Sequence, residues 1–215
     1  MTQSLAEKQK RAQEIYRSLE KIVPDSGMIL EYGNNFELLV SVMLSAQCTD
    51  VMVNRVTKKL FKKYRTLDDY INAPRYEFEQ DIRMCGYYKQ KAKRIQETSR
   101  IIKEKHGGVI PRTMDDMLEL PGVARKTANV VLGNAYSVVE GIAVDTHVRR
   151  ISQRLGLTQH TDPKKIESDL MKLFPKEQWF RLTYLMIEYG RRYSPARKKE
   201  GGILEEVYGK KKISK

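Results

Sequence analysis

Residues 120–131 read LPGVARKTANVV, and this stretch decides the fold. The Pro-Gly pair marks a tight turn, and the residues after it begin a helix with Lys126 in its first turn. The N–H groups of such a turn and of a helix N-terminus attract an anion. The same positive potential, with Arg125 adjacent, favours the uncharged, nucleophilic form of the Lys126 amine. The pattern indicates an element that holds a phosphate and presents a nucleophile, which suits chemistry on a nucleic-acid sugar.

The alternative interpretation of this stretch is a structural helix-turn-helix corner with a solvated lysine. A second motif, VDTHVRR at residues 144–150, favours the chemical interpretation because it places Asp145 19 residues after Lys126. The residues after Asp145 form an apolar stripe with helical spacing, made by Val148, Ile151 and Leu155. Gly156 then ends the pattern, so Asp145 is predicted to be the N-cap of a helix. A capping aspartate is compatible with a catalytic role.

The composition indicates a nucleic-acid partner. Lys and Arg number 40 against 27 Asp and Glu, which gives a net charge of +13 and a pI near 9.6, as a phosphate-binding surface requires. No stretch approaches the ~20 apolar residues of a membrane span, and the N-terminus lacks the apolar centre of a secretory signal. Two cysteines, Cys48 and Cys85, give no disulfide framework. We expect a cytoplasmic protein without a membrane partner.

The spacing of apolar residues predicts an all-α fold with no strand. Helices are expected near residues 4–22, 35–46, 50–64, 67–73, 75–83, 88–106, 113–119, 124–135, 145–155, 163–174 and 176–190. Several of them begin at recognisable capping residues, namely Asn35, Asp50, Thr113 and Asp162, the last followed by Pro163.

Three strings resemble motifs of the endonuclease III branch of the helix-hairpin-helix (HhH-GPD) DNA glycosylase superfamily: LLVSVMLSAQCTDVMVN at 38–54, LPGVARKTANVV, and AVDTHVRR at 143–150. The similarity runs from about Phe36 to Arg197. It implies a two-lobed all-α fold with a DNA-binding cleft between the lobes. A six-helix module at 28–139 would contain the hairpin, and 1–27 plus 140–215 would form the second lobe. By the same resemblance Lys126 is the Schiff-base lysine and Asp145 the carboxylate that works with it.

The resemblance also implies a set of DNA contacts. Gln47 matches the residue that fills the gap left by an extruded nucleotide, and Tyr87 stands where the family usually carries a leucine wedge. Tyrosine can still stack on neighbouring bases. His147 is compatible with a phosphate contact and equally with a helix-surface position. The remaining expected contacts are Gly122, Val123, Ala124, Arg125, Thr127, Arg197, Lys198 and Lys199.

The chain departs from the family in two further places. Relatives commonly bind a [4Fe–4S] cluster through four cysteines, and the matching positions here are Ser194, Gly201, Leu204 and Lys210. None is a thiolate, so we expect no metal and no cofactor. Ala124 stands where the hairpin often has a second glycine. If that position needs a positive φ, alanine costs about 1 kcal/mol, and otherwise the change is innocuous.

The resemblance therefore predicts a monomeric bifunctional DNA glycosylase and abasic-site (AP) lyase of base excision repair. Its partner would be double-stranded DNA that contains oxidised pyrimidines or abasic sites. A monofunctional glycosylase for adenine or mispaired thymine is one alternative, and the presence of Lys126 disfavours it. A non-catalytic helix-hairpin-helix module that binds distorted DNA is the other, and it would need neither Lys126 nor Asp145.

Overall fold

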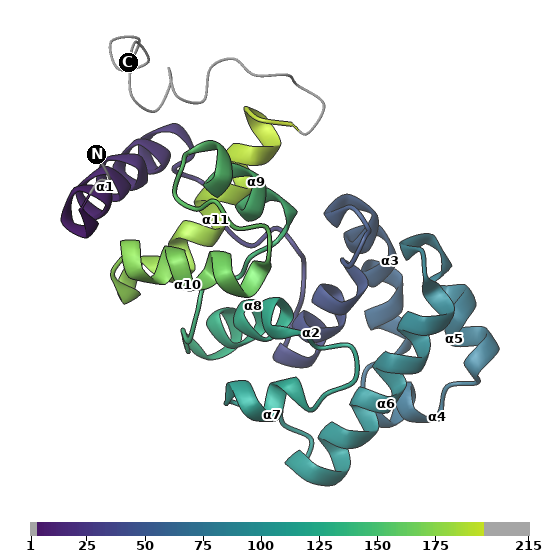
Figure 1. Ribbon diagram of the computed structural model, residues 1–215. Coiled ribbons are helices and arrows are strands. Elements are labelled where there is room, and N and C mark those ends of the chain that lie inside the picture. The colour runs from purple at the N-terminus through teal and green to yellow at the C-terminus, as the bar shows by residue number, and fades with distance from the viewer. Residues whose placement is uncertain (1–3, 196–215) are drawn as a thin grey trace. The chain divides into compact units, whose positions relative to one another are not determined.

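The computed structural model describes residues 4–195 and confirms the predicted all-α fold (Figure 1). This part of the chain contains eleven α-helices, one short 3-10 helix and no strand. The elements are α1 Leu5–Ile22, α2 Asn35–Leu44, α3 Asp50–Lys63, α4 Leu67–Asn72, α5 Arg75–Asp81, η1 Arg83–Cys85, α6 Tyr88–His106, α7 Met114–Leu118, α8 Arg125–Tyr136, α9 Thr146–Arg154, α10 Pro163–Leu173 and α11 Lys176–Arg192. No helix in residues 4–195 combines the length and the apolar character that crossing a membrane requires.

The described residues form two compact units. One unit is Ile29–Val138, and the other combines the residues up to Met28 with those from Val139 onward. The first unit therefore holds the helices from α2 to α8, and the second holds α1 together with α9, α10 and α11.

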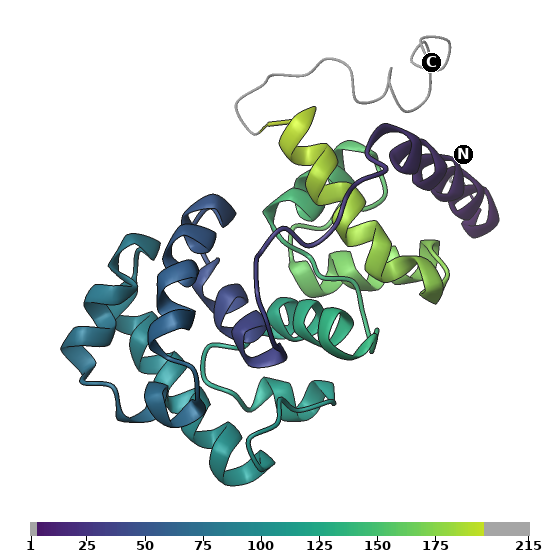
Figure 2. The ribbon, with the colours of Figure 1, turned by 180° about the vertical axis from the view of Figure 1, so that it is seen from behind.

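In the second unit, α11 lies between α1 and α9 (Figure 2). Helix α1 begins with a capping box, in which Ser4 and Glu7 satisfy each other's backbone N–H groups. Its buried face, made by Ala12, Ile15, Tyr16 and Leu19, belongs to one apolar core with residues of α9, α10 and α11. Arg181 of α11 donates to the carbonyls of Pro24 and Ser26 and so holds the segment that leaves α1.

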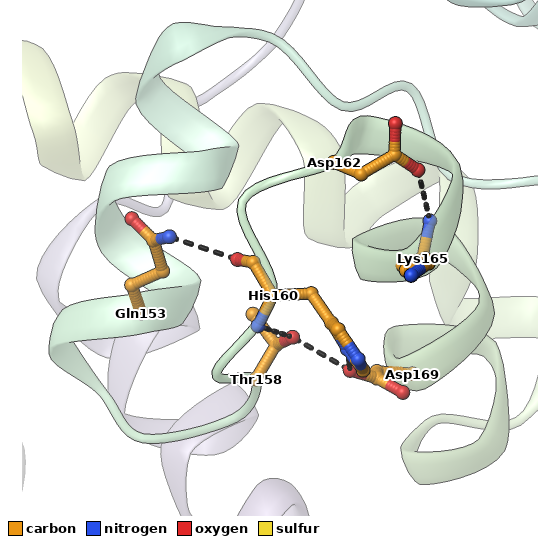
Figure 3. Close-up of polar contacts among 6 residues, drawn as sticks. All are labelled: Gln153, Thr158, His160, Asp162, Lys165 and Asp169. Carbon is orange, nitrogen blue, oxygen red and sulfur yellow. Dashed lines mark hydrogen bonds and ion pairs between the residues drawn. The ribbon is translucent and has the colours of Figure 1, made fainter.

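The loop between α9 and α10 is held by one carboxylate (Figure 3). Oδ2 of Asp169 accepts from Thr158 Oγ1 at 2.6 Å and lies 2.7 Å from His160 Nδ1. Gln153 of α9 donates to the carbonyl of His160 at 2.8 Å. The loop then enters α10 at Asp162, whose side chain accepts from the N–H of Lys165. These bonds join the loop to both α9 and α10.

In the unit Ile29–Val138, helices α4, α5 and α2 pack against α6. Four aromatic rings, those of Phe36, Tyr64, Tyr70 of α4 and Phe78 of α5, meet edge to face or tilted. Gln96, buried on α6, donates from Nε2 to the carbonyls of Tyr70 and Ala73, each at 2.9 Å. The amide thereby supplies donors to the chain where α4 ends.

The helix starts agree with the sequence except at two caps. Thr113, Asp145 and Asp162 are N-caps as predicted, and Gly156, with φ +62°, follows α9. The caps of α2 and α3 are Asn34 and Thr49, one residue before the predicted Asn35 and Asp50. Those predictions were wrong because each helix has two adjacent capping residue types, and the earlier one accepts from the N–H three residues on.

We expect Asp169→Asn to lower stability at neutral pH and much less in acid. Burial raises the pKa of Asp169, but the hydrogen bonds from Thr158 and His160 outweigh burial and hold that pKa below its ordinary value. Such a carboxylate stabilises the fold above the unfolded pKa of ~3.9 and loses its effect as the pH falls through the lower folded value. Urea unfolding at pH 7 should show a loss of about 1 kcal/mol.

Asp25→Asn is the control, because Asp25 is exposed in the same unit. It should change the free energy of unfolding little at either pH. A deficit in Asp169→Asn that stays constant from pH 7 down to acid would contradict the assigned role of the charge.

Candidate nucleic-acid interface

The turn between α7 and α8 has the geometry that the Pro-Gly pair predicts. The N–H of Val123 donates to the carbonyl of Leu120 at 3.0 Å, and Gly122 has φ +84°. Proline followed by a residue with positive φ is the pattern of a type II turn. Thr98, buried on α6, donates from Oγ1 to the carbonyl of Pro121 at 3.0 Å and holds the turn against α6.

Glycine is required at position 122 and not at position 124. A Cβ atom on Gly122 would lie 2.7 Å from Cδ of Arg94, in addition to the strain of a positive φ. Ala124 has φ −94° and ψ 168°, an extended conformation that any residue adopts. The structure therefore supports the possibility that alanine at position 124 causes no backbone strain.

The N-terminus of α8 has no side-chain cap from its N-cap residue. Its N-cap is Ala124, which has no side-chain acceptor, and the first turn contains no acidic residue. The N–H groups of that turn therefore have no side-chain cap, and the positive end of the helix dipole lies beside them. Ala124 is exposed, and the three residues that follow it, Arg125, Lys126 and Thr127, are half-buried.

A pocket brings three of the predicted DNA contacts together. Gln47 comes from the loop between α2 and α3, Tyr87 from the segment before α6, and Gly122 from the hairpin. The pocket has a volume of about 170 Å³ and is lined by Met43, Ala46, Gln47, Tyr87, Gln90, Lys91, Arg94 and Gly122. The side chain of Tyr87 is 65% exposed. Residues far apart in the sequence thus share one surface of the unit Ile29–Val138.

Gln47 and Tyr87 both have a left-handed backbone. Their φ angles are 54° and 46°, whereas side chains other than glycine rarely adopt a positive φ. Such strain persists only where the surroundings hold it in place, and it concentrates at functional sites.

The sequence did not single out Lys91, which lines the same pocket. Its side chain is buried, and Nζ donates to three backbone carbonyls. The available signal was its position on the apolar stripe of α6, four residues before Ile95 and followed by Ile102. A lysine on the buried stripe of a helix needs partners that the local sequence does not supply.

Asp145 and His147 lie in the other unit, at the start of α9. Oδ1 of Asp145 accepts from the N–H of Val148 at 2.8 Å, and the side chain is half-buried. Nδ1 of His147 lies 3.2 Å from Nη2 of Arg150. The same Nη2 donates to the carbonyls of Ser194 and Gly190, so Arg150 joins the start of α9 to the end of α11.

The residues present do not fit an iron–sulfur cluster. Ser194, at the first of the four matching positions, is buried, and its Oγ accepts from Nη1 of Arg154 at 2.5 Å. Arg150 donates to the carbonyl of Ser194 at 2.7 Å and to that of Gly190 at 3.2 Å. Arginine side chains thus hold the end of α11. The other three matching positions and the expected contacts Arg197, Lys198 and Lys199 lie outside the described residues.

The two cysteines do not supply an alternative metal site in the described part of the chain. Both lie in the unit Ile29–Val138, Cys85 is buried, and Cys48 is partly exposed. Burial raises the pKa of the Cys85 thiol to about 12, so it is not a ready thiolate ligand. Residues 4–195 contain no group of three His, Cys, Asp or Glu side chains that could hold an ion.

Comparison with known proteins decides the family. Residues 40–176 match the family described as HhH-GPD superfamily base excision DNA repair protein. The chain is 46% identical over 198 residues to endonuclease III of Synechocystis sp., covering 92% of this chain and 90% of the relative. The chain belongs to the endonuclease III branch of the HhH-GPD superfamily. It is also 48% identical over 174 residues to endonuclease III of Bacillus subtilis, covering 80% of this chain and 79% of that one. The resemblance seen in the sequence is confirmed.

Solved structures agree with this assignment. A non-covalent endonuclease III–DNA complex aligns with a TM-score of 0.85 and 46% identity, covering 88% of this chain and 89% of that chain. A trapped endonuclease III–DNA covalent intermediate aligns with the same values. A thermostable thymine-DNA glycosylase, at 21% identity and a TM-score of 0.75, shares the fold.

Two substitutions in the hairpin should show that glycine is needed at position 122 and not at position 124. Gly122→Ala should lower the free energy of unfolding by about 1–3 kcal/mol, because of the positive φ and the contact with Arg94. It should also weaken binding to duplex DNA, because the turn moves. Ala124→Gly should change stability by no more than about 0.5 kcal/mol. Urea unfolding and a duplex-binding titration measure both; a stabilising effect of Ala124→Gly well beyond that would contradict the extended backbone at position 124.

Proposed function

We propose that this protein is a bifunctional DNA glycosylase and AP lyase that excises oxidised pyrimidines from duplex DNA. The observation that carries the proposal is Lys126 in the first turn of α8, where the N–H groups have no side-chain cap and follow a Pro-Gly turn. The membership of the endonuclease III branch supports it, as does the relative that was trapped covalently on DNA.

The hairpin is the proposed phosphate contact. The N-terminus of α8 and the turn at Gly122 offer backbone donors to one phosphate, and Arg125 and Thr127 flank them. The N–H of Val123 already bonds to Leu120, and its side chain is buried, so Val123 supports the turn from within. The net charge of +13 supplies the long-range attraction to DNA.

Extrusion of the damaged nucleotide is assigned to the pocket surface. A base inside the duplex is out of reach of an amine, so the protein must flip it and occupy the gap. Gln47 would fill that gap, and the exposed ring of Tyr87 would stack on the neighbouring bases. His147, at the start of α9, is proposed as a contact to a backbone phosphate in the same complex. Arg197, Lys198 and Lys199 are proposed as further phosphate contacts.

The chemistry assigned to Lys126 begins at the sugar. The neutral amine attacks C1′, the new N–C1′ bond forms, and the bond from C1′ to the base breaks with its electron pair leaving on the base. Ring opening gives an imine to the sugar. The imine acidifies the C2′ protons, and loss of one expels the 3′ phosphate by β-elimination. Asp145 stabilises positive charge that develops on the sugar or assists proton transfer.

Cellular location and assembly follow from the same proposal. The substrate of base excision repair is chromosomal DNA, so we place the protein in the cytoplasm, associated with the nucleoid. A monomer suffices, because both proposed reactive side chains, Lys126 and Asp145, come from this chain. A monofunctional glycosylase would excise a base without forming an imine, and a non-catalytic module would bind damaged duplex and leave it intact.

Lys126→Ala and Lys126→Gln should abolish borohydride trapping on a duplex with one abasic site, and abolish its cleavage. Duplex binding should persist, because the backbone donors of the hairpin stay in place. Lys103→Ala is the control, since Lys103 is an exposed lysine that pairs with Asp68; it should trap like the wild type. An adduct formed by Lys126→Ala at the wild-type rate would identify another amine as the nucleophile.

Asp145→Asn should slow base excision by roughly 10²–10³-fold, because the amide loses the charge that stabilises the transition state. Folding should hardly change, since asparagine is also an N-cap. Cleavage at a ready-made abasic site, which needs no base departure, should suffer less. Asp162→Asn, the same change at the cap of α10, should leave both rates unaffected. Equal loss in the two aspartate variants would show that helix capping, not charge, explains the effect.

A further inference from the structure

Lys91 has a bonding pattern that the proposed chemistry does not use. Its side chain is 8% exposed. Nζ donates to the carbonyls of Leu44 at 2.8 Å, Ala46 at 2.7 Å and Cys85 at 2.8 Å. A lysine ammonium has three N–H donors and no acceptor, so three carbonyls match its full capacity.

These carbonyls belong to the two segments that carry the proposed gap-filling residue, Gln47, and the proposed stacking residue, Tyr87. Ala46 directly precedes Gln47, and Cys85 lies two residues before Tyr87. The backbone N–H of Lys91 also donates to the carbonyl of Tyr87 at 3.0 Å. One residue thus bonds to both segments, which are otherwise about 40 positions apart in the sequence.

The site offers the Lys91 ammonium only acceptors, although burial works against its charge. Leu44 is the last residue of α2, so its carbonyl lies at the negative end of the helix dipole. Burial lowers the pKa of Lys91 below its ordinary value. The three short hydrogen bonds to carbonyls offset this cost, because bonds that involve a charged donor are stronger than neutral ones.

The backbone of both segments is strained where Lys91 holds it. Gln47 and Tyr87 have positive φ angles, which they would leave readily if their neighbouring carbonyls were free to move. Gln47, Tyr87 and Lys91 line one pocket, so the two side chains proposed to enter the duplex share a surface with the lysine.

We propose that Lys91 is a positioning residue for base extrusion, which fixes the Gln47 and Tyr87 segments to each other so that both side chains enter the duplex from one rigid platform. This inference rests on the proposed function. It goes beyond it by naming a residue that touches neither the sugar nor the base. Without Lys91 the two segments move separately. The entropy cost of ordering them is then added to the free energy of base extrusion.

The test compares Lys91→Met, Lys91→Gln and Lys93→Met with the wild type. Methionine removes the donors at similar length, and glutamine restores two of them. Lys93 is an exposed lysine on the same helix, so Lys93→Met controls for the loss of charge. Extrusion is followed by the fluorescence of 2-aminopurine opposite an oxidised pyrimidine in a duplex. Borohydride trapping on single-stranded DNA with one abasic site needs no extrusion and counts the active molecules.

Lys91→Met should reduce the fluorescence change and the rate of base excision from duplex by about tenfold or more per active molecule. Trapping on the single strand should stay near the wild-type level. Lys91→Gln should give a fluorescence change and an excision rate between those of Lys91→Met and the wild type. Lys93→Met should extrude the base as the wild type does. In a Tyr87→Ala background the further loss from Lys91→Met should be smaller, since the two residues act as a unit.

Two results would overturn the inference. One is wild-type extrusion by Lys91→Met, and the other is an equal loss on duplex and single-stranded substrates, which would make Lys91 merely structural. If Lys91→Met fails to fold, as judged by circular dichroism, the same comparison is made with Lys91→Gln. A wild-type protein that traps no abasic DNA would overturn the proposed function instead, and the fluorescence of the bound duplex would still test Lys91.

Discussion

Backbone carbonyls at the ends of short helices need donors, and in the unit Ile29–Val138 the buried polar side chains of α6 supply them. Lys91 satisfies the end of α2 and the residue that ends η1, Gln96 satisfies the chain after α4, and Thr98 satisfies the hairpin turn. Each bond joins α6 to a loop, so the loops take their positions from one helix. Loss of any one donor leaves a buried carbonyl unpaired, which costs more than the hydrogen bond itself contributes.

The residues proposed for the chemistry lie at two helix N-termini, those of α8 and α9. Backbone N–H groups are the local hydrogen-bond donors at both. At α8 the cap is an alanine, which makes no side-chain hydrogen bond to the first turn. At α9 the cap is Asp145, and one of its carboxylate oxygens accepts from the N–H of Val148. This bond fixes the orientation of the carboxylate. The two helix starts therefore differ in charge, which suits the phosphate contact proposed at α8 and the catalytic role proposed for Asp145.

The sequence predicted the structural features that depend on residues close together in the chain. Helical spacing located all eleven α-helices of residues 4–195. The turn at Gly122 and the cap at Asp145 were predicted because the hydrogen-bonded residues lie three positions apart. It missed Lys91, whose carbonyl partners Leu44 and Ala46 lie 47 and 45 residues away. It also left open whether Ala124 needed a positive φ, since that angle depends on how the hairpin packs against α6. The caps at Asn34 and Thr49 were misplaced by one residue, because two adjacent side chains could each have served.

The left-handed backbone at Gln47 and Tyr87 lowers the stability of the fold at two residues that are proposed to recognise damaged DNA. Each positive φ on a residue other than glycine costs about 1 kcal/mol, so glycine or asparagine at either position would relax the chain. A screen that rewards heat resistance alone would therefore favour such replacements. The more heat-resistant variants would lack the amide that is proposed to fill the gap or the ring that is proposed to stack. If Gln47 and Tyr87 have these proposed roles, thermal tolerance and damage detection are opposed demands on the same two residues.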